Sequence, residues 1–299
     1  MKRLNKYLLQ TFFAVFLLAI LSVLISNLSI NLVRTGMGLN FGWLIQPSGF
    51  ALGETSLPYK PSDNYAWALC IGWINSLRVI VIGLILATIF GLLGGIARIS
   101  QNTLLRKLSS LYVALVRQIP LLLQLMFWYF VVFLSLSEIP IPIIGSLLVI
   151  SNKGINFLGV NLSVEFSSLL VGLSVFTGAS IAEVVRGGLS SVPKGQLEAF
   201  RSLGLSESLG ITKIVLPQAL PAIIPGLTSQ YLNLAKNSTL AIAVGYADLY
   251  AVSDTTITQT GRAIEGFLVL LTSFLLLNLI INGGMEVFNK LTMKANYHQ

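Results

Sequence analysis

Residues that bind metals or carry out catalysis are nearly absent from this chain. Cysteine and histidine each occur once in 299 residues, as Cys70 and His298. A single cysteine cannot form an internal disulfide, and a single histidine cannot supply a histidine metal cluster or a serine–histidine–aspartate triad. The sequence also has no Gly-x-x-x-x-Gly-Lys-Ser/Thr phosphate loop, so the chain cannot itself hydrolyse nucleotides. We therefore expect no catalytic residue, no metal site and no cofactor bound by this chain.

Charged residues are also scarce. They make up 10% of the sequence, whereas hydrophobic residues make up 55%, and the mean hydropathy is +0.82. This composition is too apolar for a water-soluble globular domain of this length, so we expect the chain to lie in a bilayer. A hydrocarbon core of about 30 Å requires about 20 helical residues. Six segments are predicted to cross it: 7–28, 77–97, 111–133, 166–185, 226–249 and 263–282.

Positive charge is distributed unevenly among the loops. Alternate loops, taken with the two termini, hold eleven lysines and arginines, whereas the other loops hold four. Because positive residues stay on the cytoplasmic side during insertion, both termini are predicted to be cytoplasmic. The net charge of +8 then reflects topology and contact with anionic membrane lipid, and no nucleic-acid partner is expected. The first apolar run is longer than that of a secretory signal and is predicted to remain as an anchor.

The predicted organisation is one transmembrane domain over residues 1–299, with an outer segment at 30–75 and a cytoplasmic loop at 188–220. This loop has the pattern of an amphipathic helix, because Leu197 and Phe200 recur at helical spacing opposite Glu198. A loop that only connects two spans needs no such helix. We therefore expect it to bind a partner, with a helix resting on the inner membrane surface as the alternative.

A turn and a second helix are predicted after the amphipathic helix. Gly204 supplies a residue that readily takes the left-handed conformation at a helix end. Ser206 can then cap a short helix that leads to Pro217, where the chain re-enters the membrane. The loop is therefore predicted to be a helix-turn-helix.

The spacing in this loop resembles the EAA loop of the permease subunits of bacterial ABC import systems. That pattern is Glu-Ala-Ala, three residues, glycine, nine residues, then Ile-x-Leu-Pro. Phe200 departs from it by standing where the pattern has its last alanine, and we expect its extra bulk to affect the fit against the partner. The matching positions are Glu198, Ala199, Gly204, Ile214, Leu216 and Pro217.

Further stretches resemble the polar amino-acid branch of this family, and together they cover most of the chain. They lie at 115–122, 127–130, 181–188, 191–195 and 230–238. The long outer segment around 31–50 is more similar to the general amino-acid permeases than to the shorter histidine-type ones.

The resemblance implies an all-α integral membrane protein with the six-span ABC importer permease fold and cytoplasmic EAA-type coupling helices. It implies a multi-pass protein of a bacterial inner membrane that takes up amino acids. Its implied partners are two ATPase subunits that bind ATP and Mg, a second permease subunit, identical or related, and a solute-binding protein outside the cell. The residues implied to couple this chain to the ATPase are Glu198, Ala199, Phe200, Gly204, Leu216 and Pro217.

Lys236 is a candidate for the substrate pathway. It lies ten residues into its predicted span, which is about 15 Å from the start and near the midplane. With Asn237 and Ser238 beside it, the lysine would suit the carboxylate of an amino acid. A lysine that only holds helices together is the alternative.

Glu183 and Arg117 are two further candidates, because a charge inside a span usually faces protein or a wet cavity. They are predicted to lie near the inner surface and could pair with each other. A pair between Glu183 and Arg186, one turn further along, is the simpler interpretation. A structural role is favoured for both residues, with a gating role as the alternative. Pro120 is predicted to kink the third span.

Two other functions remain open from the sequence. A secondary transporter driven by an ion gradient would show inverted repeats and several carboxylates inside the membrane. We find no persuasive repeat, and Glu183 is the one acid well inside a span apart from Glu265 near an outer end. A structural subunit of a larger membrane complex would need neither a pathway nor a coupling loop.

Overall fold

The computed structural model describes residues 2–34 and 38–297, and His298 lies outside these ranges. The chain divides into two compact units, Met1–Leu44 and Ile45–Gln299. The first unit holds helix α1 (Lys2–Arg34), whose stretch Tyr7–Leu32 is apolar and has none of its residues buried. A helix of this length and composition can cross a membrane by itself.

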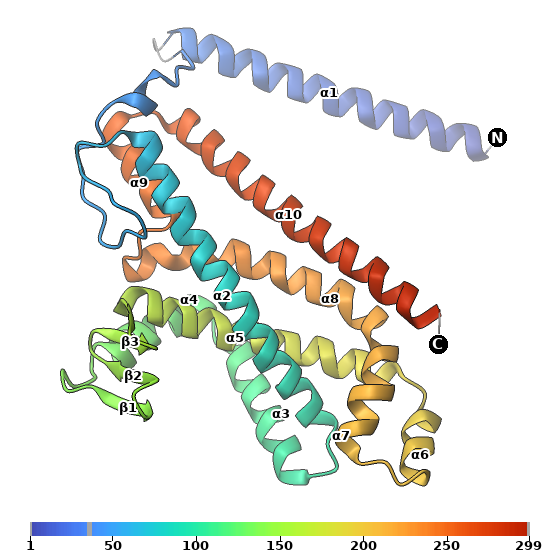
Figure 1. The fold of residues 1–299 in the computed structure, drawn as a ribbon. Coiled ribbons are helices and arrows are strands. Elements are labelled where there is room, and N and C mark those ends of the chain that lie inside the picture. The colour runs from blue at the N-terminus through green and yellow to red at the C-terminus, as the bar shows by residue number, and fades with distance from the viewer. Residues whose placement is uncertain (1, 35–37, 298–299) are drawn as a thin grey trace. The chain divides into compact units, whose positions relative to one another are not determined.

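The second unit is mainly helical (Figure 1). Within the described residues of the whole chain, five helical segments are long and apolar enough to cross a membrane. Helix α3 and the following α4–η2 segment would together form a sixth, although a bend of 105° separates them. The break falls at Pro120, so the predicted kink is confirmed. The short helix η1 (Gly42–Ile45) lies at the boundary between the two units. The helices of the second unit are α2 (Tyr65–Ile99), α3 (Thr103–Gln118), α4 (Leu121–Met126), η2 (Phe127–Phe133), α5 (Val164–Ser191), α6 (Lys194–Ser202), α7 (Glu207–Gly210), η3 (Ile211–Val215), α8 (Leu216–Asn237), η4 (Ser238–Val244), α9 (Leu249–Thr260) and α10 (Ala263–Tyr297).

Helices α2 and α5 pack against each other along much of their length and form the centre of this unit. Small residues on α2 allow the close approach. A Cβ atom at Gly91 would lie 2.3 Å from Cγ2 of Ile181, and one at Gly95 would lie 2.6 Å from Cβ of Val185. Such small residues at a helix interface are typical of membrane proteins, where tight packing replaces the hydrophobic effect between helices.

Two spans begin more than ten residues before the positions that the sequence predicted. Helix α2 starts at Tyr65 rather than at residue 77, because the side chain of Asn64 caps it by accepting a hydrogen bond from the backbone N of Trp67. The fifth span is helical from Ile211 to Val244, whereas the prediction began it at residue 226. Proline and polar residues in the first half of this span lowered its apolar signal, yet the helix continues through Pro221 and Pro225.

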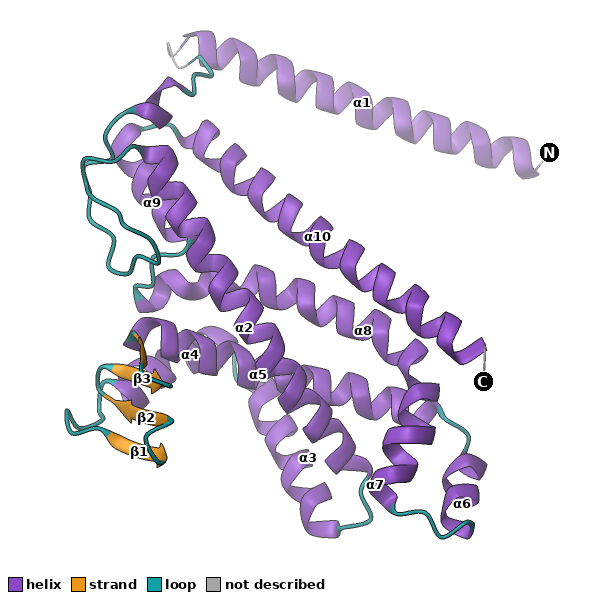
Figure 2. Ribbon diagram, viewed as in Figure 1, coloured by secondary structure: helices purple, strands orange, loops and turns teal. Residues whose placement is uncertain are grey.

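The loop between η2 and α5 forms a small antiparallel sheet that was not predicted (Figure 2). Its strands lie in sequence order and are β1 (Ile141–Ile144), β2 (Leu148–Ser151), β3 (Gly154–Phe157) and β4 (Val160–Leu162). Isoleucine and valine favour strands, and glycines at the turns permit short hairpins. The prediction of an all-helical chain therefore omitted this sheet, while the helical transmembrane architecture is confirmed.

Candidate functional site

The loop that resembles the EAA motif folds as the predicted helix-turn-helix. Helix α6 ends at a left-handed Gly204 with φ of 71°, and the backbone N of Gly204 donates to the carbonyl oxygen of Arg201 at 3.0 Å. The hydroxyl of Ser206 accepts a hydrogen bond from the backbone N of Leu209 at 3.3 Å, as expected for a residue that caps α7. This part of the sequence prediction is therefore confirmed.

Phe200 points into its own chain. It is 1% exposed and packs with Val215 in the core that also contains the end of α5. A Cβ atom at Gly210 would lie 2.3 Å from Cδ2 of Phe200, so the ring sits directly on the backbone of α7. The extra bulk of Phe200 relative to alanine is thus accommodated inside the loop. It holds α6 against α7 and is not available on the surface for a partner.

The opposite side of α6 is exposed. Glu198, Ala199 and Gly204 lie on the surface. Leu203, at the tip of the loop, is an apolar residue that is 76% exposed. Leu216 and Pro217 are half-buried at the start of α8, where they continue the loop into the span.

Polar contacts attach this loop to two neighbouring segments. Nε of Arg201 lies 2.6 Å from Oε1 of Glu207, which joins α6 to α7. The amide of Gln101, in the turn between α2 and α3, donates to the same carboxylate oxygen at 3.0 Å. The hydrogen bond to Glu207 raises the pKa of the Arg201 guanidinium above its usual value. One carboxylate, that of Glu207, therefore links α6 to the α2–α3 turn.

Glu183 is surrounded by three arginines. It forms ion pairs with Arg98 and with Arg186, whose Nε lies 3.0 Å from Oε1 of Glu183, and Nη1 of Arg117 lies 4.0 Å from Oε2. Both predicted partners of Glu183 are thus present. Arg98 was not predicted as a partner, because it was assigned to the following loop, whereas α2 continues to Ile99.

This cluster carries an excess of positive charge beside a cavity of about 390 Å³. Three guanidinium groups face one carboxylate, and Nε of Arg98 is buried with no hydrogen-bond partner among the described residues. A cavity with this lining can hold an anion. The lining residues are Arg98, Ser110, Val113, Ala114, Arg117, Gln118 and Glu183.

Lys236 is not part of this cavity. It is the penultimate residue of α8 and lies 25 residues after Ile211, where the helical span begins. The prediction counted the depth of Lys236 from residue 226, whereas the helix begins earlier, so its depth in the membrane stays a prediction. Lys236 is exposed and Asn237 half-buried, while the hydroxyl of Ser238 is buried and donates to the carbonyl oxygen of Ala235 at 2.8 Å.

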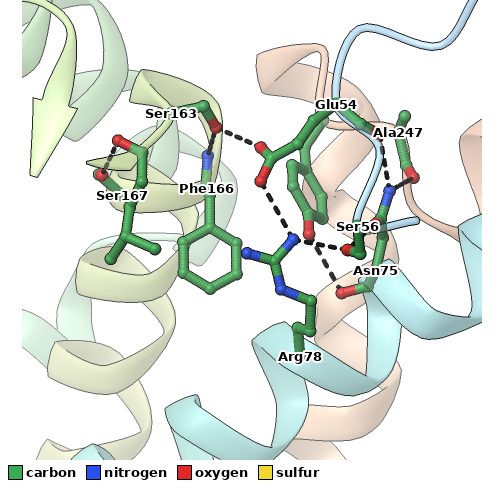
Figure 3. Close-up of polar contacts among 10 residues, drawn as sticks. Glu54, Ser56, Asn75, Arg78, Ser163, Phe166, Ser167 and Ala247 are labelled. Carbon is green, nitrogen blue, oxygen red and sulfur yellow. Dashed lines mark hydrogen bonds and ion pairs between the residues drawn. The ribbon is translucent and has the colours of Figure 1, made fainter. Parts of the chain in front are cut away.

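A second polar cluster, absent from the predicted site, lies at the other end of α2 and α5 (Figure 3). Nη1 of Arg78 lies 3.2 Å from Oε1 of Glu54 and 2.7 Å from Oγ of Ser56, and Glu54 also accepts a hydrogen bond from Ser163. The amide of Asn75 donates to the carbonyl oxygen of Glu54 at 3.0 Å. These contacts fasten the outer segment to α2 and to the start of α5. The sequence signal for this cluster was the presence of two polar residues, Asn75 and Arg78, inside an apolar run.

Comparison with known proteins places the chain in a family. Residues 87–294 match the family model described as binding-protein-dependent transport system inner membrane component. The chain is 32% identical to the putative amino-acid ABC transporter permease protein YhdX of Escherichia coli, over 95% of this chain and 93% of that protein. It is 34% identical to the general L-amino acid transport system permease protein AapQ of Rhizobium johnstonii, over 88% and 86% of the two chains.

A solved structure shares the fold. The crystal structure of an amino acid ABC transporter with histidines matches 76% of this chain and 94% of its own chain, with a TM-score of 0.59 at 23% identity. The loop that resembles the EAA motif, here called the coupling-type loop, the membrane-spanning helices and these matches all indicate the same family. The chain belongs to the inner membrane component family of binding-protein-dependent transport systems, and it is a permease subunit.

Proposed function

We propose that this chain is the translocation subunit of an ATP-driven importer of amino acids, with ATP and Mg bound by a separate ATPase. The observation that carries the proposal is that one face of α6 is exposed, while Phe200 on the other face is buried and holds the helix in place. The relatives YhdX and AapQ are named as amino-acid permeases, which supports this cargo. Family membership does not favour a secondary transporter or a purely structural subunit.

In this proposal, α6 docks on the ATPase through Glu198, Ala199 and Leu203. Closure of the ATPase dimer on ATP displaces α6. Because Phe200 packs with residues of α5 and α8 and Arg201 is linked through Glu207 to the α2–α3 turn, the displacement reaches several spans together. Leu216 and Pro217 form the junction through which α8 follows the loop.

The positive cavity beside Glu183 is the proposed site for the carboxylate of the cargo. A charge inside a membrane span is stable only next to protein or water, so the charged cavity suits a water-filled pathway. Arg117 is the arginine best placed to bind, because it is half-exposed and, at 4.0 Å, is paired less closely with Glu183 than Arg98 and Arg186 are. Lys236 and Asn237 form a second proposed group on the pathway, while Ser238 is assigned to packing because its hydroxyl is engaged.

The remaining partners follow from the same proposal. A second permease subunit completes the pathway, and a solute-binding protein delivers the amino acid at the face opposite α6. The distribution of lysine and arginine supports a cytoplasmic location for α6 and for both termini.

Purification and uptake test the proposal. The chain should co-elute with an ATPase encoded beside it, and Leu203→Asp should abolish this co-elution, because burying an unpaired charge at the interface is costly. Ser202→Asp, next to it on the same surface, serves as the control for added charge. Uptake competition across a panel of amino acids then defines the cargo. Uptake by this chain alone, driven by an ion gradient, would refute the proposal.

A further inference from the structure

A cavity of about 790 Å³ lies beside the polar cluster of Figure 3, at the end of α5 opposite α6. Its walls come from parts of the chain that are distant in sequence: the outer segment, α2, and the sheet with the start of α5. The volume is within the range of about 300–1,000 Å³ that is usual for sites of small molecules. This outer cavity is lined in part by Glu54, Thr55, Ser56, Arg78, Lys153 and Ser163.

The charges that line the outer cavity do not cancel. Lys153 lies in the turn between β2 and β3 and forms no ion pair with another described residue. Arg78 is paired with Glu54, which is the one acid among the described residues that line the cavity. Two cations therefore face one carboxylate, and one positive charge is left over. A concave surface with such an excess attracts anions.

The guanidinium of Arg78 is held in a fixed position with donors to spare. Its Nη1 binds Glu54 and Ser56, and the group lies over the ring of Phe166, 4.9 Å from the ring centre. Nε and Nη2 have no hydrogen-bond partner among the described residues, and 31% of the side chain is exposed. These two donors of an arginine can bind one carboxylate through parallel hydrogen bonds.

Glu54 is also held in place. Its carboxylate accepts a hydrogen bond from Ser163, the residue that caps α5. Its backbone carbonyl oxygen accepts one from the amide of Asn75, which donates to the carbonyl oxygen of Ala247 as well, at 2.8 Å. The outer cavity thus presents a positioned carboxylate beside two cations, which is the arrangement that complements the ammonium and carboxylate groups of an amino acid.

The outer cavity is separate from the cavity beside Glu183. The two share no lining residue. Ser163 caps the start of α5, and Glu183 lies 20 residues further along the chain, which is about 30 Å at 1.5 Å per residue. The same helix therefore has one charged cavity near each end, and the outer one is remote from the coupling-type loop.

We propose that the outer cavity is an entry site that binds one amino acid before it reaches the cavity beside Glu183. The inference rests on the proposed function, which makes amino acids the cargo. The α-carboxylate binds Lys153 and the free donors of Arg78, and the α-ammonium binds Glu54. A second carboxylate in the side chain compensates the charge that is left over. The site therefore prefers L-glutamate and L-aspartate to L-lysine and L-arginine, which would add to the excess.

Protection of a cysteine from labelling tests this proposal. Thr55→Cys places a thiol in the lining of the outer cavity, in a Cys70→Ala background. The complex that co-elutes with the ATPase is placed in lipid nanodiscs without a solute-binding protein and without ATP. L-Glutamate should slow the reaction of this thiol with a water-soluble maleimide several-fold, and L-arginine at the same concentration should not.

Variants of Lys153 then test the role of the charge. Lys153→Gln should raise the concentration of L-glutamate needed for half-protection about tenfold, which corresponds to about 1.4 kcal/mol. Lys60→Gln is the matched control, because Lys60 is another exposed lysine of the outer segment and does not line the outer cavity. Lys153→Glu leaves the cavity with an excess of negative charge, so L-arginine should replace L-glutamate as the protecting amino acid.

Three outcomes would overturn the proposal. They are no protection by L-glutamate, equal protection by both amino acids, and protection that appears only when a solute-binding protein is added. The last result would make the cavity a docking surface for that protein. The measurement needs neither uptake nor ATP hydrolysis. A complex that co-elutes with its ATPase but shows no protection would therefore refute the entry site and leave the proposed function standing.

Discussion

Phe200 occupies the space that a side chain at Gly210 would fill. The ring is 1% exposed, and a Cβ atom at Gly210 would lie 2.3 Å from its Cδ2 atom. The two residues belong to different helices of the coupling-type loop, so their contact fixes the angle between α6 and α7. A loop that transmits a displacement from one subunit to another needs its two helices held at a fixed angle.

Gly210→Ala should therefore damage coupling. The added methyl group overpacks the contact with Phe200, which typically costs about 1–3 kcal/mol. We expect a lower melting temperature and a weaker stimulation of the ATPase, measured on the purified complex. Phe200→Ala makes room for the methyl group, so the double variant should lose less than the two single variants combined. Additive losses would show that the two residues do not act as a pair.

The sequence was informative about this loop because its signals are local. Helical periodicity around Glu198, the turn at Gly204 and the cap at Ser206 are each set by neighbouring residues, and all three were predicted correctly. The burial of Phe200 was not predictable in the same way. It depends on Gly210 and on the ends of two spans, which are brought together only by the tertiary fold.

The positions of the spans and the candidate pathway show the same difference between features set by neighbouring residues and features set by the tertiary fold. A window of hydropathy located the spans but began the fifth at residue 226, whereas its helix begins at Ile211, so the depth of Lys236 in the membrane stays a prediction. Glu183 was predicted to pair with Arg186 or Arg117, and both pairs exist. Arg98 joins them from a helix distant in sequence, and no local pattern could reveal this. The β-sheet was missed because its strands are only three or four residues long.

Gly91→Ala should loosen the packing of α2 against α5. Its methyl group would come within 2.3 Å of Ile181, a side chain that is itself fully buried. The cost should be about 1–3 kcal/mol, seen as a lower melting temperature of the complex in detergent. Gly83→Ala on the same helix is the matched control, because its nearest neighbour, Leu234, would be at an ordinary 3.6 Å. Equal effects of the two substitutions would contradict this account of the interface.

Asp248 should make stability depend on pH. It lies between the last two spans and caps α9 by accepting a hydrogen bond from the backbone N of Ala251 at 2.8 Å, and its Oδ2 has no partner among the described residues. Burial raises the pKa of Asp248 to about 7. The folded state thus holds a proton that the unfolded state releases near pH 4. Stability should therefore fall as the pH rises from about 4 to about 7 and change little from this source above that.

Asp248→Asn tests this dependence while keeping a residue that caps helices well. At pH 8 the variant should be more stable than the parent chain by about 2–4 kcal/mol, because it no longer buries a charge. Near pH 4 the two proteins should unfold at similar temperatures. Thermal unfolding between pH 4 and pH 8 measures the difference. A variant that is equally stabilised at every pH would exclude titration of Asp248 as the cause.

Arg117 provides the sharpest test of the proposed pathway. The guanidinium is half-exposed beside the cavity at Glu183, and Arg98 and Arg186 already compensate that carboxylate more closely. Removing the Arg117 charge should therefore leave the fold intact. If Arg117 binds the cargo carboxylate, Arg117→Gln should raise the KM for uptake about tenfold, which corresponds to about 1.4 kcal/mol, and leave the melting temperature unchanged.

Lys107→Gln removes the same charge from the same helix at a position outside the cavity, so it controls for a general loss of positive charge. Its KM should match that of the parent chain. The position of Arg117 on α3 also separates binding from coupling, because α6 and its contacts are untouched by the change. Stimulation of the ATPase at saturating substrate should therefore persist in Arg117→Gln. A lower maximal rate with an unchanged KM would assign Arg117 to the conformational change instead of to the cargo.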